Sequence, residues 1–126
     1  DTSGPVSLPI QGSGEETRAF CFVDDFIDGF MSVVARGEHL GIYNIGTEEE
    51  ITIAALAGEL GRCFYREVVV VPGDLPAGAT SRRCPDIAKL RALGYEPHVP
   101  LREGLERTVR WYDADETLVR ERTETP

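Results

Sequence analysis

The residues of this 126-residue chain that are best suited to binding chemistry are a glycine-rich loop, Gly12-Ser13-Gly14, and the arginine that follows it, Arg18. Arg18 is the only lysine or arginine between positions 1 and 36. A guanidinium group is always charged and presents a planar fork of donors, so an arginine beside such a loop is suited to paired contacts with a phosphate. The alternative is a surface arginine paired with Glu15 or Glu16, and this stretch alone favours that alternative, because charged side chains are mostly solvated.

The elements around Arg18 are predicted to be a loop, a strand and a helix. Phe20 to Val23 is apolar and aromatic, which predicts a buried strand with Cys21 in the core. Asp24 and Asp25 then suit a helix start, where carboxylates accept from free backbone N–H groups, so we interpret them as caps rather than as an acid/base couple. Apolar residues recur from position 26 to 34, and Gly37 is expected to end this helix.

The rest of the chain alternates short strands with helices. Strands are predicted at 6–10, 42–45 and 67–71, the first of them an edge strand because prolines flank it. A helix over 53–60 is expected to be capped by Thr52, and the next helix to be capped by Asp86 and closed by Gly94. A last helix starts near Leu101, with Trp111 partly buried against it.

Composition restricts the class of partner. The chain carries 22 acidic and 13 basic residues, a net charge of −9, which argues against nucleic acid or an anionic membrane because both bind basic surfaces. A few arginines can still form a local pocket for a small anion. Three widely spaced cysteines, with no C-x-x-C pair, suit reduced thiols and a cytoplasmic protein. His39 and His98 have no ligand-like spacing to a cysteine or an acid, so no metal site is expected.

The limits of the chain also suggest an interpretation. The sequence has no initiator methionine, and its first clear element comes only near residue 20, which suggests a piece of a longer chain. No signal peptide and no apolar run of transmembrane length is recognisable. Residues 1–113 are predicted to form one small domain, and residues 114–126 a polar tail that frays.

Taken together, five motifs in order resemble a known family: G-S-G-E-E-T-R-A-F-C-F-V-D-D, Y-N-I-G, I-T-I-A-A-L-A, R-R-C-P-D-I-A-K and L-G-Y-E-P-H-V-P-L-R-E-G-L. They are similar to the C-terminal part of the extended short-chain dehydrogenases/reductases, which are NAD-dependent nucleotide-sugar epimerases, dehydratases and decarboxylases. The UDP-glucuronate decarboxylase branch is the most similar. The resemblance covers residues 6–113 and implies an α/β fold of short strands with four helices, the substrate-binding part of an extended Rossmann-type enzyme, without the Rossmann core.

The resemblance also implies site residues. Its arginine before the strand contacts the nucleotide diphosphate or the base, and this is Arg18, which the resemblance now favours as a ligand-binding residue. A second arginine, either Arg82 or Arg83, is expected to reach the diphosphate. Phe20 is expected to wall the nucleotide site, and Asp74 to meet a ribose hydroxyl.

The family's catalytic parts are missing from this sequence. No G-x-x-G-x-x-G loop follows a strand, and Gly12 and Gly14 precede a strand rather than a helix. No tyrosine has a lysine at the fourth following position, because the only lysine is Lys89. We therefore expect no catalytic residue, no bound metal and no NAD on this chain alone, although the intact enzyme uses NAD.

The expected partners are a nucleotide diphosphate sugar and the N-terminal Rossmann half of the same enzyme. By resemblance, the strand 42–45 and the first helix would join the sheet of that half. Alone they would leave a strand edge and an apolar face, so a homo-oligomer is expected. Asn44 is expected to hold a neighbouring loop. The alternative function is a non-catalytic module for nucleotide-sugar binding or oligomerisation.

Overall fold

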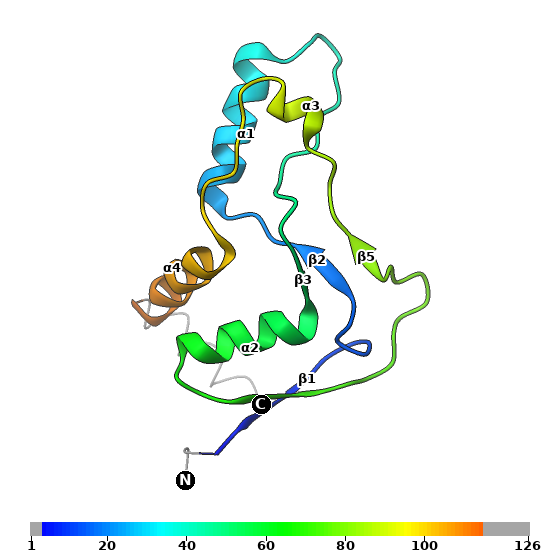
Figure 1. Cartoon of the computed structure of the whole chain (residues 1–126), viewed down its shortest axis with the longest axis vertical. Helices are drawn as coiled ribbons and strands as arrows, with labels where there is room; N and C mark the ends of the chain where they lie inside the picture. The colour runs from blue at the N-terminus through cyan, green and yellow to red at the C-terminus, as the bar shows by residue number, and fades with distance from the viewer. Residues whose placement is uncertain (1–3, 115–126) are drawn as a thin grey trace, which may run out of the picture.

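The computed structural model describes residues 4–114, which form an elongated α/β arrangement (Figure 1). The strands are β1 (Val6–Pro9), β2 (Thr17–Ala19), β3 (Glu50–Thr52), β4 (Val68–Val71) and β5 (Arg82–Arg83). The helices are α1 (Val23–Arg36), α2 (Ile53–Cys63), α3 (Ala88–Arg91) and α4 (Leu101–Ala114). Short strands with four helices are what the sequence predicted.

The strands form two small sheets. β1 pairs with β4 in parallel, from Val6 opposite Val68 to Pro9 opposite Val71, which confirms the predicted strands there. The second sheet has the order β3-β2-β5, in which β2 is antiparallel to β3 and parallel to β5. Figure 1 shows this second sheet between α2 and the α1–α3 end of the molecule. β2 is thus the central strand of this second sheet.

The predicted strand from Phe20 to Val23 is wrong, because the strand lies three residues earlier, at Thr17–Ala19. All three residues pair with β3, and Thr17 and Arg18 also pair with β5, whereas α1 already begins at Val23. A strand forms where partner strands supply hydrogen bonds. The position of β2 is therefore set by its neighbouring strands and not by the apolar composition of the residues that follow it. The predicted end of α1 at Gly37 is confirmed.

Asp24 and Asp25 do not cap α1, contrary to the prediction. The N-cap residue is Phe22, which makes no capping bond with its side chain. Asp25 is 1% exposed and accepts hydrogen bonds from the backbone N–H groups of His98 and Val99, both at 3.0 Å. Asp25 therefore ties the start of α1 to the segment before α4, a contact between residues far apart in sequence.

The predicted strand over 42–45 is also absent, and these residues have no regular secondary structure. A strand needs a partner, and the described part of the chain provides none beside this segment. The side-chain amide of Asn44 donates to the backbone oxygen of Asp86 at 3.0 Å, which confirms the expectation that Asn44 holds a neighbouring loop.

Three helices follow the prediction with changed lengths. Thr52 caps α2 by accepting from the N–H of Ala55 at 3.1 Å, and α2 runs beyond the predicted end, to Cys63. Asp86 accepts from the N–H of Ala88 at 2.9 Å, but α3 has only four residues. Trp111 on α4 is 59% exposed, so its expected burial is wrong. Most of the predicted tail, 115–126, lies outside the described residues.

The core is small and lies where α1, α3 and the segment 43–46 meet. Its buried residues are Ile87, Leu90 and Tyr95, with Val33, Tyr43, Ile45 and Leu93 packed around them. Burial raises the pKa of the Tyr95 hydroxyl, which donates to the backbone oxygen of Gly46 at 2.8 Å. Cys21, expected in the core, is half-buried, and burial raises the pKa of its thiol.

The outer face of α1 is apolar, and no other part of residues 4–114 covers it. Its exposed large side chains are 46–65% accessible: Val23, Phe26, Ile27, Phe30, Met31 and Val34. Apolar residues at helical spacing are normally turned toward a core, and here the opposite side of the helix already faces one. Within residues 4–114, no helix has the length and apolarity needed to cross a membrane.

Candidate anion-binding groove

The glycine-rich loop wraps around a carboxylate of the chain itself. Gly12 and Gly14 have φ angles of 92° and 93°, and a Cβ atom on Gly12 would lie 2.6 Å from Glu16 Oε1. Glu16 is 6% exposed and accepts from the N–H groups of Ser13 and Gly14 at 3.1 and 2.9 Å. Backbone hydrogen bonds, from Glu16 itself first and then from Ser13, lower the pKa of this carboxyl group. The loop donors that could have held a ligand phosphate are therefore engaged by Glu16.

The strand register separates the three arginines of the region. In the β2–β5 pair, Thr17 lies opposite Arg82 and Arg18 lies opposite Arg83. Successive side chains of a strand point to opposite faces, so Arg18 and Arg83 share one face and Arg82 belongs to the other. The sequence left open which of Arg82 and Arg83 accompanies Arg18, and the register pairs Arg18 with Arg83.

The guanidinium groups of Arg18 and Arg83 meet at Thr80, in the loop before β5. Arg18 Nη2 donates to the backbone oxygen of Thr80 at 2.9 Å, and Arg83 Nε donates to Thr80 Oγ1 at 2.8 Å. Arg18 also donates to the backbone oxygen of Thr17 at 2.6 Å. The alternative pairing of Arg18 with Glu15 or Glu16 does not occur among the described interactions. The two positive charges therefore converge on one place.

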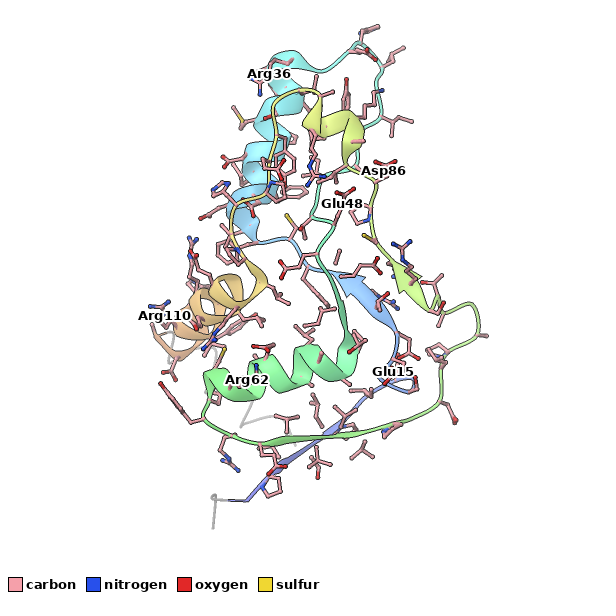
Figure 2. The ribbon with its side chains drawn as sticks, in the orientation of Figure 1. Glu15, Arg36, Glu48, Arg62, Asp86 and Arg110 are labelled. Atoms are coloured by element: carbon pink, nitrogen blue, oxygen red, sulfur yellow. The ribbon has the colours of Figure 1, made fainter. Side chains whose placement is uncertain are left out.

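The two arginines line an open groove of about 550 Å³. The loop between β4 and β5, residues 75–79, forms one wall, and the remaining lining residues are Ile10, Gln11, Glu16 and Ile53. Figure 2 shows Glu15 on the loop that enters β2, at this end of the molecule. A groove with convergent guanidinium groups beside an apolar wall suits a ligand that has an anionic part and a flat or apolar part.

Arg82 is engaged on the opposite face of the sheet. Its Nε lies 3.0 Å from both carboxylate oxygens of Glu50 on β3, and Thr17 Oγ1 donates to Glu50 Oε2 at 2.9 Å. The hydrogen bond from Arg82 lowers the pKa of Glu50, and the same bond raises the pKa of Arg82.

Two predicted site residues lie outside the groove lining. Phe20 follows β2 and is 39% exposed, and Asp74 is exposed in the loop after β4. Their roles stay predictions. Sequence reasoning missed Gln11, which lines the groove, and Thr80, which accepts hydrogen bonds from both groove arginines. Neither belongs to a motif, and only the strand register brings Thr80 between the arginines.

A second hollow, of about 330 Å³, lies between α2 and α4. Arg62 and Arg110, labelled in Figure 2, line it together with Glu59 and Glu106. Arg62 pairs with Glu59, and the backbone oxygen of Glu106 accepts from Arg110 Nε at 3.2 Å. This hollow thus contains acids beside its arginines, and Figure 2 shows that it is distant from Glu15.

Asp25, Asp28 and His98 form a cluster that sequence spacing did not indicate. One potential ligand atom from each residue lies within 4.8 Å of the others. His98 Nδ1 lies 3.0 Å from Asp25 Oδ1, and His98 Nε2 lies 3.8 Å from Asp28 Oδ2. The fold thus brings His98 next to two acids that are distant from it in sequence, and the expectation of no metal site stays a prediction. Asp25 already serves as the acceptor for two backbone N–H groups there.

No family model matches the sequence. Individual relatives do match. Human dTDP-D-glucose 4,6-dehydratase is 34% identical over 82% of the chain, and UDP-glucuronic acid decarboxylase 6 of Arabidopsis thaliana is 36% identical over 79%. GDP-L-fucose synthase 1 of Arabidopsis thaliana is 38% identical over 87%. The chain spans only 31%, 29% and 34% of the lengths of these three relatives.

Solved structures give the same result. Epimerase Mth375 from Methanothermobacter thermautotrophicus matches 94% of the chain with 37% identity and a TM-score of 0.83, and the chain covers 36% of it. UDP-glucuronic acid 4-epimerase from Bacillus cereus, in complex with UDP-glucuronic acid and NAD, matches 86% of the chain with 26% identity and a TM-score of 0.78. The chain covers 35% of that structure.

The structure is a small α/β fold with an open groove, and its relatives are named as enzymes of nucleotide sugars. Over most of its length the chain is similar to the C-terminal portion of extended short-chain dehydrogenases/reductases, and it covers about a third of the relatives that it matches. UDP-glucuronic acid decarboxylases are among its relatives, with dehydratases and a GDP-L-fucose synthase at similar identity.

Proposed function

We propose that the chain is the substrate-binding portion of an NAD-dependent nucleotide-sugar epimerase, dehydratase or decarboxylase. The observation that carries this proposal is the meeting of Arg18 and Arg83 at Thr80, on one face of the sheet and at the edge of an open groove. Two guanidinium groups on one small anion give charge-assisted, paired hydrogen bonds, which are the strong class of hydrogen bond. The ligand class that fits is a nucleotide diphosphate sugar.

In this proposal each part of the groove has a separate task. Arg18 and Arg83 exchange their bonds to Thr80 for bonds to the diphosphate. The apolar wall at residues 75–79 packs against the nucleoside, and the sugar extends toward the part of the enzyme that carries the chemistry. Binding of the diphosphate by remote groups then orients the sugar for a reaction at some distance from them.

We propose that this chain alone is not catalytic and does not hold NAD. NAD takes and returns a hydride in enzymes of this class, and a glycine-rich loop before a helix binds its pyrophosphate. The glycine loop here leads into a strand, and its N–H groups at Ser13 and Gly14 are bonded to Glu16, so these residues do not fit that cofactor. Lys89, the only lysine, lies in α3 and contacts Glu38 at 3.6 Å, outside the groove lining.

We further propose that the N-terminal half of the intact enzyme covers the apolar face of α1 and pairs with the segment 42–45. Both features are unpartnered in the described residues. The segment could pair with the edge of a sheet, and the face of α1 could pack on that sheet. Without that half, the face is expected to drive self-association of the chain. The three free cysteines fit the cytoplasmic location that we propose for the enzyme.

Calorimetric titration of UDP-, dTDP- and GDP-sugars tests the proposal. Arg18→Ala and Arg83→Ala are each expected to lower the affinity by more than about tenfold, because hydrogen bonds to charged groups contribute about 1.5–3 kcal/mol. The matched control is Arg62→Ala, which removes an arginine of the other hollow and leaves the groove unchanged. Equal affinity of the parent and both groove variants would exclude this groove as the diphosphate site.

A further inference from the structure

The carboxylate of Glu50 joins all three strands of the β3-β2-β5 sheet. Glu50 belongs to β3, and its oxygens accept from Thr17 of β2 at 2.9 Å and from Arg82 of β5 at 3.0 Å. All of these contacts lie on the face opposite the groove, because Arg82 and Arg83 point to opposite sides of the strand. Glu50 is therefore a cross-strand tie behind the groove.

β5 depends on this tie because the strand is very short. It has two residues, both exposed, and within residues 4–114 it pairs only with β2. The backbone hydrogen bond from Thr17 N–H to the oxygen of Ser81, at 2.9 Å, holds its start. A two-residue edge strand makes few backbone hydrogen bonds with its neighbour. Contacts of its side chains therefore contribute a larger part of its stability. Immobilising the side chain of Arg82 also immobilises the backbone from which Arg83 extends.

The tie also separates the roles of two adjacent cations. Without an acid behind the sheet, the side chain of Arg82 would carry an unpaired positive charge on a two-residue strand beside Arg83. The paired contact with Glu50 neutralises Arg82 on its own face and leaves the charge of Arg83 beside that of Arg18. The sequence R-R gives no indication of this division.

We propose that Glu50 is a positioning residue for the anion groove, acting through Arg82 and β5 to hold Arg83 beside Arg18. This inference rests on the proposed function, since it assigns a role to Glu50 in diphosphate binding at the same groove. Glu50 itself touches no ligand. Its effect on affinity passes entirely through Arg83.

A double-mutant cycle between Glu50 and Arg83 tests this directly, with UDP and dTDP as the titrated probes. Glu50→Gln is expected to weaken binding about three- to tenfold, and Arg82→Gln to do the same, because residues of one network are energetically coupled. In an Arg83→Ala background, Glu50→Gln should change the affinity by less than about 1.5-fold. Additive effects in the cycle would overturn the proposal, because a residue that acts only on general stability gives no coupling to Arg83.

Charge reversal adds a rescue arm. Glu50→Arg alone should abolish the tie, and Glu50→Arg combined with Arg82→Glu should restore most of the affinity lost. Glu59→Gln is the matched control, since it breaks the Glu59–Arg62 ion pair away from the sheet and should leave the affinity unchanged. Failure of the reversed pair to rescue, with folded variants by circular dichroism, counts against the tie.

Amide hydrogen exchange separates this proposal from the proposed function. In Glu50→Gln, the Thr17 amide that donates to Ser81 should exchange about tenfold faster than in the parent, while the Ala55 amide in α2 stays unchanged. If the parent binds neither diphosphate, the proposed function fails and the exchange rates still test the tie. If the parent binds and the Thr17 amide is unaffected, the tie alone is refuted.

Discussion

The β3-β2-β5 sheet and the outer face of α1 differ in how many of their side chains find a partner within this chain. In the β3-β2-β5 sheet, charged groups find partners within the chain: Glu50 with Arg82, Glu16 with its loop, and both groove arginines with Thr80. On α1, aromatic and aliphatic side chains are about half exposed, with no cover in the described residues. The polar groups of the first region are therefore satisfied within the chain, whereas the second region leaves apolar area exposed in the described residues.

The contrast matters because polar contacts and apolar burial respond differently when a neighbouring domain is absent. Hydrogen bonds and ion pairs that close within one chain survive the loss of a neighbouring domain. An apolar face loses its stabilisation when its cover is removed, because burial of apolar area is the source of that stabilisation. The groove can thus keep its geometry in a chain that spans about a third of its relatives.

The largest expected effect concerns the inner side of α1, where a buried acid holds the helix. Asp25→Ala leaves the N–H groups of His98 and Val99 without an acceptor and should lower the free energy of unfolding by about 3 kcal/mol. The neighbour Asp24 is the control, since it forms an exposed ion pair with Arg107 at 2.6 Å. Asp24→Ala should cost less than about 1 kcal/mol. Equal losses in urea unfolding would mean that Asp25 has no special role.

The outer face of α1 gives the next prediction. Phe26→Ser and Phe30→Ser remove aromatic groups that are 46% and 50% exposed, so self-association of the chain should weaken by at least about tenfold for each. Sedimentation velocity over micromolar concentrations measures this. Tyr65→Ser, which alters a side chain that is 97% exposed and lies outside α1, serves as the control. A parent that sediments as a clean monomer contradicts the expectation.

The glycine loop allows a matched pair of substitutions. Gly12→Ala meets both a φ of 92° and the Glu16 carboxylate at 2.6 Å, and should cost about 2 kcal/mol in thermal unfolding. Gly78 has a φ of 80°, and a Cβ atom there would have no atom within 4 Å. Gly78→Ala should therefore cost only the backbone strain of about 1 kcal/mol. The difference between them measures how tightly the loop encloses Glu16, and no difference would mean that the loop relaxes freely.

The smallest effect is a pH dependence at the same loop. Hydrogen bonds place the pKa of Glu16 below its value of 4.5 in the unfolded chain. Its contribution to stability is therefore fully present above pH 4.5 and is lost as the pH falls through the lowered, folded pKa. Glu16→Gln should flatten the fall in the urea midpoint between neutral and acidic pH. A variant that loses stability as steeply as the parent would remove Glu16 from this role.

Local chemistry predicted the elements that carry their own signals. Thr52 marks the start of α2, Gly37 the end of α1, and the valine run gives β4, because caps, stops and β-branched residues act within a few positions. The predicted strands at 20–23 and 42–45 failed for one reason. The register and the existence of a strand depend on partner strands that are distant in sequence.

The site shows the same division. Arg18 stands out in the sequence by its isolation and its glycine neighbours, and motif resemblance brings in the pair Arg82-Arg83. The choice between those two arginines depends on the β2–β5 register, which no local pattern contains. Thr80, Gln11 and the cluster around His98 were likewise invisible, because their neighbours are far away along the chain.

The sequence by itself indicated the resemblance to a family, the class of helices and short strands, and the arginines that we propose as diphosphate ligands, since these follow from residue type and order. Only the tertiary structure decided that Arg83 and not Arg82 shares a face with Arg18, that Glu16 fills its own loop, and that Asp25 pins α1. The physical reason is that side-chain direction and hydrogen-bond partnership are set by pairing across distance, whereas composition and spacing report only on neighbours along the chain.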